Sequence, residues 1–439
     1  MNVDFPYPGY RGIAPVEIPD DRLMGIYAPK ALPDTDEEKI LQEGLTRPYE
    51  APRLRHMLGP GSRVLILFDD GTRVTPIHRL LPYIVHELAA AGVPDSQVKL
   101  LSALGTHRPM SEAELQQKLG LFRDRFEVHQ HEWLNDSQLH EFGRTSDGTR
   151  VTANRLMAEC NFVLGLGAIV PHRVKGLSGG AKIAFPGVSG KEMMFRNQWE
   201  ASMQMSETVM GVAENSMRLR MEEAARIAGL KYIVNLVQDR DDRIVGCFAG
   251  EPVRAHREGG KLAREICGVR MPERADIVII DAYPADRDFW QSAKGAYAGT
   301  MAVRDGGTLI LVAPNPEGVA NNHPNLMAIG YRPHAEIVRM VQSGQIEDLV
   351  GIAILADIAQ IVDKAECIMV SPGVSREDAE RLGFRYADTC DDALQMGFER
   401  QNLDAKVAVF RHGGHILPLA DERAVAACMA VEEHTPSAS

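Results

Sequence analysis

The chain alternates short apolar runs with amphipathic stretches, a pattern typical of parallel strands joined by covering helices. Residues 64–68 (VLILF) form a continuous apolar run, as expected of a strand that is buried on both faces. Apolar residues then recur at helical spacing between positions 77 and 88. Thr75 can cap this helix, and Pro76 can occupy its first position. This region is therefore predicted to form a strand, a polar turn and a helix.

Further strands and helices follow the same pattern. Ser111 and Glu114 have the spacing of a capping box, which predicts the start of another helix. Residues 1–60 are rich in proline and are predicted to form an irregular arm with short strands. The other predicted strands lie at residues 98–101, 162–170, 231–237, 275–280, 308–312, 367–370 and 406–410, and the other predicted helices lie at 215–228, 252–267, 288–303, 376–382 and 391–400.

This alternation predicts an α/β fold of two domains, with largely parallel sheets covered by helices and an active site in the cleft between the domains. At 439 residues the chain is too long for one ordinary core. The strand pattern starts afresh near residue 270. We therefore expect residues 1–268 plus 405–439 to form an N-terminal, cofactor-binding domain, and residues 270–403 to form a smaller C-terminal domain.

Composition narrows the possible partners and location. A net charge of −12 makes the chain a poor non-specific partner for nucleic acid or an anionic membrane, so an anion needs a local basic pocket. The six cysteines include no CxxC pair, which argues against zinc or iron–sulfur sites and for reduced thiols in a cytoplasmic protein. The N-terminus has no apolar signal segment, and no apolar run approaches the roughly 18 residues of a membrane span.

Reactive side chains gather in the polar loops that follow the predicted strands. After residues 64–68 come two carboxylates, Thr72 and Arg73, which could grip ribose hydroxyls and an anionic group, or form an ordinary solvated turn. His107 and His172 follow two other strands. A single histidine is more often structural, but two at the carboxyl ends of separate parallel strands could face one pocket as an acid–base pair.

A glycine-rich segment at residues 176–182 (GLSGGAK) could present backbone N–H groups to an anion, or form a flexible turn. It is not a Walker A motif, because Lys182 is followed by Ile183 and the spacing differs, so a kinase or ATPase is not expected. Further along, Gln291 and Lys294 are three residues apart and would share one face of a helix. They could bind a carboxylate or phosphate, or form a polar surface.

Four segments carry a resemblance to a known family, and they occur in the family's order: DDGTRVTP, GTHRP, PHRVKGLSGGAK with FPGVSG, and WQSAK. Together they resemble the lactate racemase family, from about residue 10 to about residue 420. The resemblance implies an isomerase, a racemase or epimerase of a small 2-hydroxy acid that works by hydride transfer. It also implies a nickel-pincer nucleotide as cofactor (pyridinium-3,5-bisthiocarboxylic acid mononucleotide nickel), and hence cofactor-biosynthesis proteins as partners.

The resemblance further implies roles for individual residues. Lys182 would carry the cofactor through a thioamide bond, and His107 and His172 would be the two acid–base histidines. Hydride transfer avoids a carbanion beside the substrate carboxylate, and the cofactor supplies that chemistry. The side chains implied to contact the substrate carboxylate or the cofactor phosphate are Arg73, Gln291 and Lys294, and the residues implied to bind the cofactor are Asp69, Asp70, Thr72, Arg73, Ser178, Gly179 and Gly180.

One position departs from the family pattern. The family's protein ligand to nickel is a histidine about sixteen residues after the lysine, where this chain has Gln198, flanked by Asn197 and Trp199. An amide oxygen is a weaker nickel ligand than imidazole, so nickel binding and the place of Gln198 at the metal are open. Two alternatives therefore stand beside the racemase: a pincer-dependent enzyme with altered metal or redox chemistry, and a catalytically silent nucleotide-binding protein. The paired histidines and Lys182 argue against a catalytically silent protein, because a protein that only binds a nucleotide needs no acid–base pair.

Overall fold

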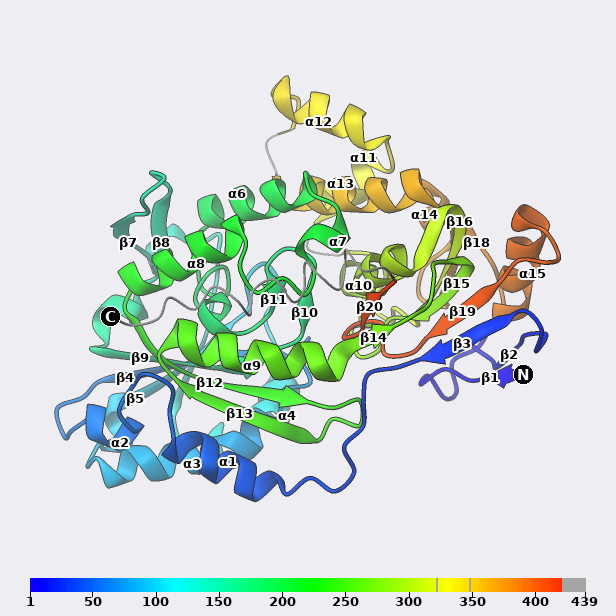
Figure 1. Cartoon of the computed structure of the whole chain (residues 1–439). Coiled ribbons are helices and arrows are strands. Elements are labelled where there is room, and N and C mark those ends of the chain that lie inside the picture. The colour runs from blue at the N-terminus through cyan, green and yellow to red at the C-terminus, as the bar shows by residue number, and fades with distance from the viewer. Residues whose placement is uncertain (321–322, 347–348, 421–439) are drawn as a thin grey trace, which may run out of the picture.

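Two six-stranded sheets form the centre of the fold, and helices cover the faces of each (Figure 1). A computed structural model describes residues 1–320, 323–346 and 349–420. All neighbouring strands of the two sheets run parallel, except β12 with β13 in the first. The strand order in the first sheet is β13 (Ile244–Gly250), β12 (Leu230–Gln238), β9 (Phe162–Ala168), β4 (Val64–Asp69), β5 (Val98–Ala103) and β6 (Glu127–Gln130). The strand order in the second sheet is β18 (Arg385–Tyr386), β17 (Glu366–Val370), β16 (Val303–Val312), β15 (Ala275–Asp281), β19 (Val407–Phe410) and β3 (Leu23–Tyr27).

Helices pack on both faces of the first sheet because its central strands are apolar on both sides. In β4, Ile66 and Phe68 join a core formed with α1, α3 and α4. Leu65 and Leu67 point to the opposite face and pack with α8 and α9. The helices around this sheet are α1 (Glu37–Thr46), α2 (Leu54–Met57), α3 (Ile77–Ala90), α4 (Glu112–Leu119), α5 (Leu156–Glu159), α8 (Ser216–Ile227) and α9 (Pro252–Cys267).

The second sheet is covered in the same way. Val278 and Ile280 of β15 pack with helices α10 and α13, whereas Ile277 and Ile279 pack with α15 and the N-terminal arm. The remaining helices are α6 (Lys191–Ser202), α7 (Ser206–Val209), α10 (Phe289–Ala302), α11 (Pro324–Ile329), α12 (His334–Gln342), α13 (Leu349–Lys364), α14 (Arg376–Arg381) and α15 (Cys390–Gln401). Short paired strands are β1 (Asn2–Val3), β2 (Val16–Glu17), β7 (Leu139–Arg144), β8 (Arg150–Asn154), β10 (Pro171–His172), β11 (Gly176–Leu177), β14 (Gly268–Arg270) and β20 (Leu417–Leu419).

The α/β fold class predicted from the sequence is confirmed, and so is the capping box of Ser111 and Glu114 at the start of α4. Two local predictions are wrong. Thr75 does not cap α3: its hydroxyl instead donates to Oδ2 of Asp69 at 2.5 Å, and Pro76 stands at the N-cap. The N-terminal arm is not irregular throughout, because it contains α1, whose Leu41 and Leu45 bury their side chains in the first core.

The last predicted strand belongs to a different sheet from the one expected. Residues 405–439 were expected to lie with the N-terminal domain. Of these, residues 421–439 lie outside the described residues, and β19 pairs with β15 and with β3 in the second sheet. Strand β3 also joins residues near the N-terminus to this sheet. A strand's own apolar pattern does not specify its partner, because the hydrogen bonds of the ladder are made with distant segments. Which residues fold as separate domains stays a prediction.

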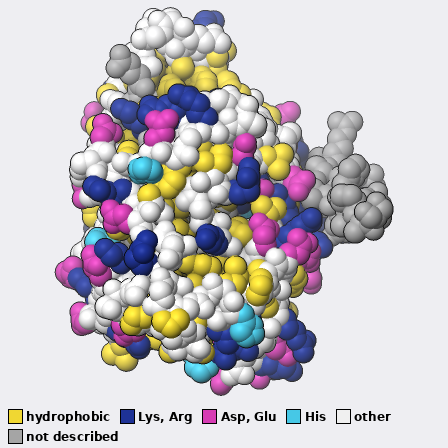
Figure 2. Space-filling model, turned by 90° about the vertical axis from the view of Figure 1, so that its left-hand side faces the viewer, with side chains coloured by type: hydrophobic (Ala, Val, Ile, Leu, Met, Phe, Trp, Pro, Cys, Tyr) yellow, Lys and Arg dark blue, Asp and Glu magenta, His cyan; other side chains and the backbone are white. Residues whose placement is uncertain are grey.

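No helix within the described ranges is long and apolar enough to cross a membrane. On the face shown in Figure 2, basic and acidic side chains are interspersed among apolar ones. Basic side chains also gather inside the protein, in the loops that follow strands β4 and β9 of the first sheet.

Candidate active site

A cavity lies where the loops after β4, β5 and β9 meet helices α6, α10 and α13. These loops follow the carboxyl ends of parallel strands, the usual place for a ligand in an open α/β sheet. The predicted site residues that line the cavity are Asp69, Asp70, Arg73, His107, His172, Ser178, Gly179, Lys182, Gln198, Gln291 and Lys294. Thr72 and Gly180 are not among the residues that line it, and Thr72 borders a smaller pocket next to His107.

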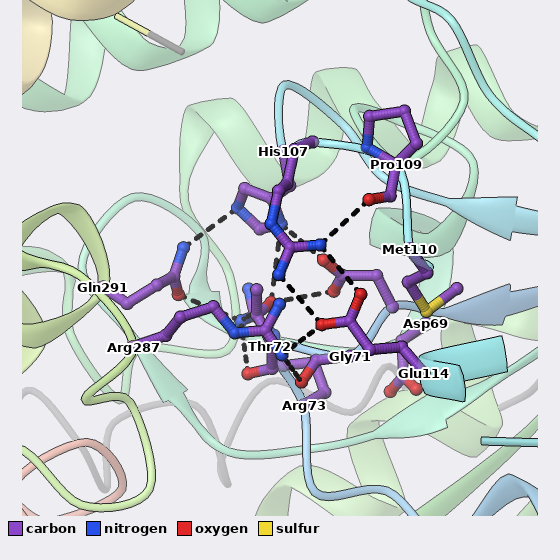
Figure 3. A network of polar contacts seen from close by, with 12 residues as sticks. Asp69, Gly71, Thr72, Arg73, His107, Pro109, Met110, Glu114, Arg287 and Gln291 are labelled. Atoms are coloured by element: carbon purple, nitrogen blue, oxygen red, sulfur yellow. Dashed lines mark hydrogen bonds and ion pairs between the residues drawn. The ribbon is translucent and has the colours of Figure 1, made fainter. Parts of the chain in front are cut away.

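His107 is held at both of its ring nitrogens (Figure 3). Its Nδ1 lies 2.8 Å from Oδ2 of Asp70, and its Nε2 lies 3.0 Å from the amide nitrogen of Gln291. Oε1 of Gln291 accepts hydrogen bonds from Nη1 of Arg73 at 3.2 Å and from Nζ of Lys294 at 2.7 Å, so the amide turns its N–H groups toward His107. His107 therefore donates its Nδ1 proton to Asp70 and offers a lone pair at Nε2.

Asp70 keeps its negative charge although it is buried. Burial would raise the pKa of Asp70, but His107 and Arg73 outweigh it, and this pKa lies well below the ordinary range. The hydroxyl of Thr72 donates to Oδ1 of Asp70 at 2.8 Å. Both residues were expected to bind a nucleotide, whereas within the chain they position His107. Asp69 is similarly engaged, because its Oδ1 lies 2.6 Å from Nζ of Lys118.

His172 has the opposite proton arrangement. The backbone N–H of Val174 donates to Nδ1 of His172 at 3.1 Å, so the neutral ring must carry its proton on Nε2. Burial lowers the pKa of His172 well below its ordinary value, and Lys182, Lys294 and Arg73 lower it further. The two histidines thus line one cavity in opposite tautomers, with the proton on Nδ1 of His107 and on Nε2 of His172.

The glycine-rich loop is shaped by partners from two other elements. Gly179 has a φ of +72° and Gly180 a φ of +60°, which favour glycine. The N–H of Gly180 donates to Oδ1 of Asn235 at 2.6 Å, so it is not open to an anion as expected. Arg218 of α8 is fully buried and donates to the carbonyl oxygens of Lys175, Leu177 and Gly179.

Ser178 also serves the loop. Its hydroxyl donates to the carbonyl oxygen of Ala168 at 2.7 Å and accepts from the N–H of Val170 at 2.9 Å. These bonds tie the glycine loop to the end of β9, and they occupy a hydroxyl that was expected to position a nucleotide.

Lys182 stands in a 3-10 turn (Gly180–Ile183) with its side chain on the cavity. Burial lowers the pKa of Lys182 to about 7, and Arg73 adds to this effect while Asp70 opposes it. At neutral pH a large share of this amine is unprotonated, which makes it a nucleophile.

Cations outnumber carboxylates around the cavity. The carboxylates Asp69 and Asp70 are engaged with Lys118 and His107, and Asp357 with Arg173. The basic side chains in the lining are Arg73, Arg173, Lys175, Lys182 and Lys294, and the acidic ones are Asp69, Asp70 and Asp357. This excess favours an anionic ligand, because each buried cation is costly without a counter-charge.

Of residues 197–199, Gln198 is the one that lines the cavity. Asn197 is buried and accepts a hydrogen bond at its Oδ1 from Arg220 at 2.9 Å, and Trp199 packs against a separate apolar cluster. The helical periodicity of α6 thus selects position 198 among the three that the sequence left open. Within the described ranges, no group of three His, Cys, Asp or Glu side chains is arranged to hold a metal ion.

Sequence reasoning missed Tyr297 and Asp357, which also line the cavity. Tyr297 stands three residues after Lys294 on α10, so the face that was singled out contained it. Asp357 is a single carboxylate within the apolar run of α13. A charged residue in such a run is rarely buried without a partner, so its position could have indicated a functional site.

An ion-pair network lies beside the smaller pocket that His107 also borders. Nη2 of Arg108 lies 2.7 Å from Oε1 of Glu317, and Nη2 of Arg287 lies 3.1 Å from Oε1 of Glu114. Arg287 also donates to the carbonyl oxygen of Gly71 at 3.1 Å. Figure 3 shows Arg287 beside Glu114 and Gly71, so a residue that follows β15 is tied to the loops of the first sheet.

Comparison with known families identifies relatives over most of the chain. A model of the lactate racemase N-terminal domain matches residues 10–211, and a model of the lactate racemase C-terminal domain matches residues 271–417. The lactate racemase of Thermoanaerobacterium thermosaccharolyticum is 29% identical over 426 residues, which are 95% of this chain and 99% of the relative. The lactate racemase of Lactiplantibacillus plantarum is 27% identical over 420 residues, 94% of this chain and 98% of the relative.

Solved structures agree with these matches. The lactate racemase apoprotein from Thermoanaerobacterium thermosaccharolyticum superposes with a TM-score of 0.84 at 27% identity, covering 95% of this chain and all of the other. A Thermotoga maritima protein superposes with a TM-score of 0.70 at 20% identity, covering 87% of this chain and 98% of the other, and at that identity it shows the fold alone.

Proposed function

Because the chain belongs to the lactate racemase family, and is thus an isomerase, we propose that it racemises or epimerises a small 2-hydroxy acid by hydride transfer with a lysine-attached nickel-pincer nucleotide. One observation carries the proposal: two histidines from separate strand-end loops border one cavity, with Lys182 and further cations in its wall. While hydride leaves, each enantiomer needs a general base near its hydroxyl group, and two histidines on one cavity can supply one for each.

The residues of the cavity fit the organic, anionic part of such a cofactor. Uncompensated cations suit a phosphate or carboxylate, and Lys182 has a pKa near neutrality, as a lysine needs for covalent attachment. When bound, the cofactor supplies the acceptor and donor of hydride. Lys182 would carry it, with Arg73 and Lys175 facing its negative charge.

The residues fit nickel less well. Lactate racemases use a nickel cofactor, but in this chain Gln198 borders the cavity where the family pattern has a histidine. An amide oxygen binds nickel more weakly than imidazole does, so the metal would depend mainly on the cofactor's own sulfur atoms. This substitution is the observation that favours the second candidate, an enzyme of the same scaffold with altered metal or redox chemistry.

His107 is prepared to act as the base. Its Nε2 lone pair faces the cavity beside Gln291, and Asp70 accepts the Nδ1 proton and stabilises the charge that develops when Nε2 takes up the substrate hydroxyl proton. Gln291 must then give up its contact with Nε2, and its Oε1 already lies within reach of Arg73 and Lys294. In this proposal these cations bind the substrate carboxylate.

His172 serves the opposite enantiomer in the proposal, after a change of proton position. In the described arrangement its Nε2 carries a proton, so it can donate a hydrogen bond but cannot accept a proton there. To act as a base it must move that proton to Nδ1 and lose the hydrogen bond from Val174. Anionic ligands would assist, because they offset the cations that hold the pKa of His172 low.

The test uses protein produced together with cofactor-making enzymes. A panel of 2-hydroxy acids is incubated with the loaded protein and analysed by chiral chromatography, with Lys182→Ala as the control. We expect inversion of at least one acid by the wild type, none by the variant, and a mass adduct at Lys182. An adduct without turnover of any acid would replace the racemase by a silent nucleotide-binding protein, and full activity of Lys182→Ala would refute attachment there.

A further inference from the structure

Five polar atoms of cavity-lining side chains make no hydrogen bond within the described part of the chain. Two of them, Oδ1 of Asp69 and Nδ2 of Asn235, belong to strands β4 and β12. The other three are Nη1 of Arg173, Oη of Tyr297 and Oδ1 of Asp357, whose side chains are buried and lie together. Native proteins leave few buried polar atoms unpaired, because each has lost its water without gaining a partner. A cluster of three at one place therefore points to a ligand that completes them.

The three side chains come from three segments and converge. Arg173 directly follows His172, Tyr297 is on α10, and Asp357 is on α13. Nη2 of Arg173 lies 2.9 Å from Oδ1 of Asp357, an ion pair without hydrogen-bond geometry at that oxygen. Tyr297 is within electrostatic reach of both, since burial raises the pKa of its hydroxyl and the Asp357 carboxylate raises it further, whereas Arg173 lowers it.

Arg173 is anchored through its other nitrogen. Nη2 donates to the carbonyl oxygen of Ala201 and to Oε1 of Gln360, each at 3.2 Å. The guanidinium is thus fixed between α6 and α13, and its Nη1 donates no hydrogen bond to the described part of the chain. Its position is set by the protein and does not depend on a ligand, which is the property of a built subsite.

Helix α10 shows how far this cluster lies from the reacting groups. Gln291 contacts His107, Lys294 follows three residues later and Tyr297 three residues after that. At 1.5 Å of rise per residue, Tyr297 stands about 4.5 Å further along the helix axis than Lys294. That is the length of three or four bonds of an extended carbon chain, so a substrate with its carboxylate at Lys294 could place a distal substituent at Tyr297.

The chemistry of the cluster selects the substituent. Arg173 and Tyr297 supply donors, and Asp357 supplies an acceptor beside them. An alkyl group would leave Nη1 of Arg173 and Oη of Tyr297 without a partner, and Oδ1 of Asp357 with its ion pair alone. A second carboxylate would face the Asp357 carboxylate. A hydroxyl accepts from Arg173 or Tyr297 and donates to Asp357 at the same time. Ile354, one turn before Asp357 on α13, lines the same wall and can pack against carbon atoms.

We propose, on the basis of the function above, that Arg173, Tyr297 and Asp357 form a distal subsite for a hydroxyl group, and that the substrate is a 2-hydroxy acid with further hydroxyls along its chain. The reaction stays at the second carbon, so the product of such a substrate is its epimer.

The test compares three four-carbon acids on the cofactor-loaded enzyme: 2-hydroxybutanoate, 2,3,4-trihydroxybutanoate and malate. Inversion at the second carbon is followed by chiral chromatography, and kcat/KM is measured for each. We expect the trihydroxy acid to exceed 2-hydroxybutanoate by at least about tenfold, as for a site built to bind a hydroxyl, and malate to fall below both. Binding to the cofactor-free protein, measured by calorimetry, should rank the acids in the same order.

Tyr297→Phe removes one donor and should lower the preference for the trihydroxy acid over 2-hydroxybutanoate by roughly tenfold. Tyr232→Phe is the matched control, because Tyr232 also has a buried hydroxyl without a partner but is not among the residues that line the cavity. It should leave this ratio unchanged. Should Tyr297→Phe not fold, the calorimetric ranking of the wild type decides alone.

The outcomes separate the two proposals. Inversion of 2-hydroxybutanoate at a kcat/KM equal to that of the trihydroxy acid, with a ratio insensitive to Tyr297→Phe, would overturn the subsite and leave the racemase standing. A preference for malate would overturn the hydroxyl assignment. Failure to invert any of the wider panel of 2-hydroxy acids, with the adduct present, would overturn the racemase and the subsite with it.

Discussion

Replacing Lys182 by methionine should make the cofactor-free protein more stable at pH 7, although the lysine borders the candidate active site. Burial and the nearby Arg73 lower the pKa of Lys182 from its ordinary 10.5 to about 7. One pKa unit corresponds to about 1.4 kcal/mol, so keeping this lysine in the folded cavity at pH 7 costs up to about 4 kcal/mol. Within that upper limit, we expect Lys182→Met to add about 2–4 kcal/mol to the free energy of unfolding.

The sign of the pH dependence follows from proton binding in the two states. In the unfolded chain this lysine keeps its proton up to about pH 10.4, whereas in the folded chain it releases the proton near pH 7. Between these values the unfolded state binds more protons, so the stability of the wild type rises with pH. The advantage of Lys182→Met should therefore shrink to about half by pH 9 and disappear near pH 10.5.

The assay is urea unfolding of the cofactor-free proteins at pH 7 and pH 9. Lys118→Met is the matched control, because Lys118 is also buried near the cavity but its Nζ lies 2.6 Å from Oδ1 of Asp69. Removing one partner of a buried ion pair should destabilise the protein by about 3–5 kcal/mol. The reasoning would be refuted if Lys182→Met were no more stable than the wild type at pH 7, or if its advantage did not fall at pH 9.

Three further predictions concern the chemistry. His107→Gln and His172→Gln should each slow net racemisation by roughly 10²–10⁴-fold, with unequal effects on half-reactions from the two enantiomers; equal defects from both would contradict a division of labour. Asp70→Asn should slow the half-reaction that depends on His107 by roughly 10–150-fold, because a hydrogen bond to a charged group contributes about 1.5–3 kcal/mol. A rate within about twofold of the wild type would show that the Asp70 carboxylate does not assist His107. Gln198→His should raise the nickel-to-protein ratio that survives dialysis against a chelator; unchanged retention, with the cofactor still attached, would mean that residue 198 is not at the metal.

Much of the site could be predicted because its residues follow strands that are locally recognisable. The apolar runs at β4, β5 and β9 are contiguous in sequence, and so are the loops with Asp70, His107 and Lys182 behind them. Their roles were less predictable. Thr72 and Ser178 have hydroxyls that could serve a ligand, but the structure engages both with the chain itself, and a sequence does not show which acceptor a hydroxyl will meet.

The sequence by itself determined many of the local units: the strands and helices around residues 64–119 and the strands that follow, the polar loops behind them, and that Gln198 occupies the position of an expected histidine. These follow from periodicity, capping and composition, which act within a few residues. Only the tertiary structure decided that β19 and β3 complete the second sheet, and that Tyr297, Arg173 and Asp357 meet at one wall. It also decided the pKa of Lys182, because that pKa depends on burial and on cations from distant segments, and electrostatic energy depends on distance in space.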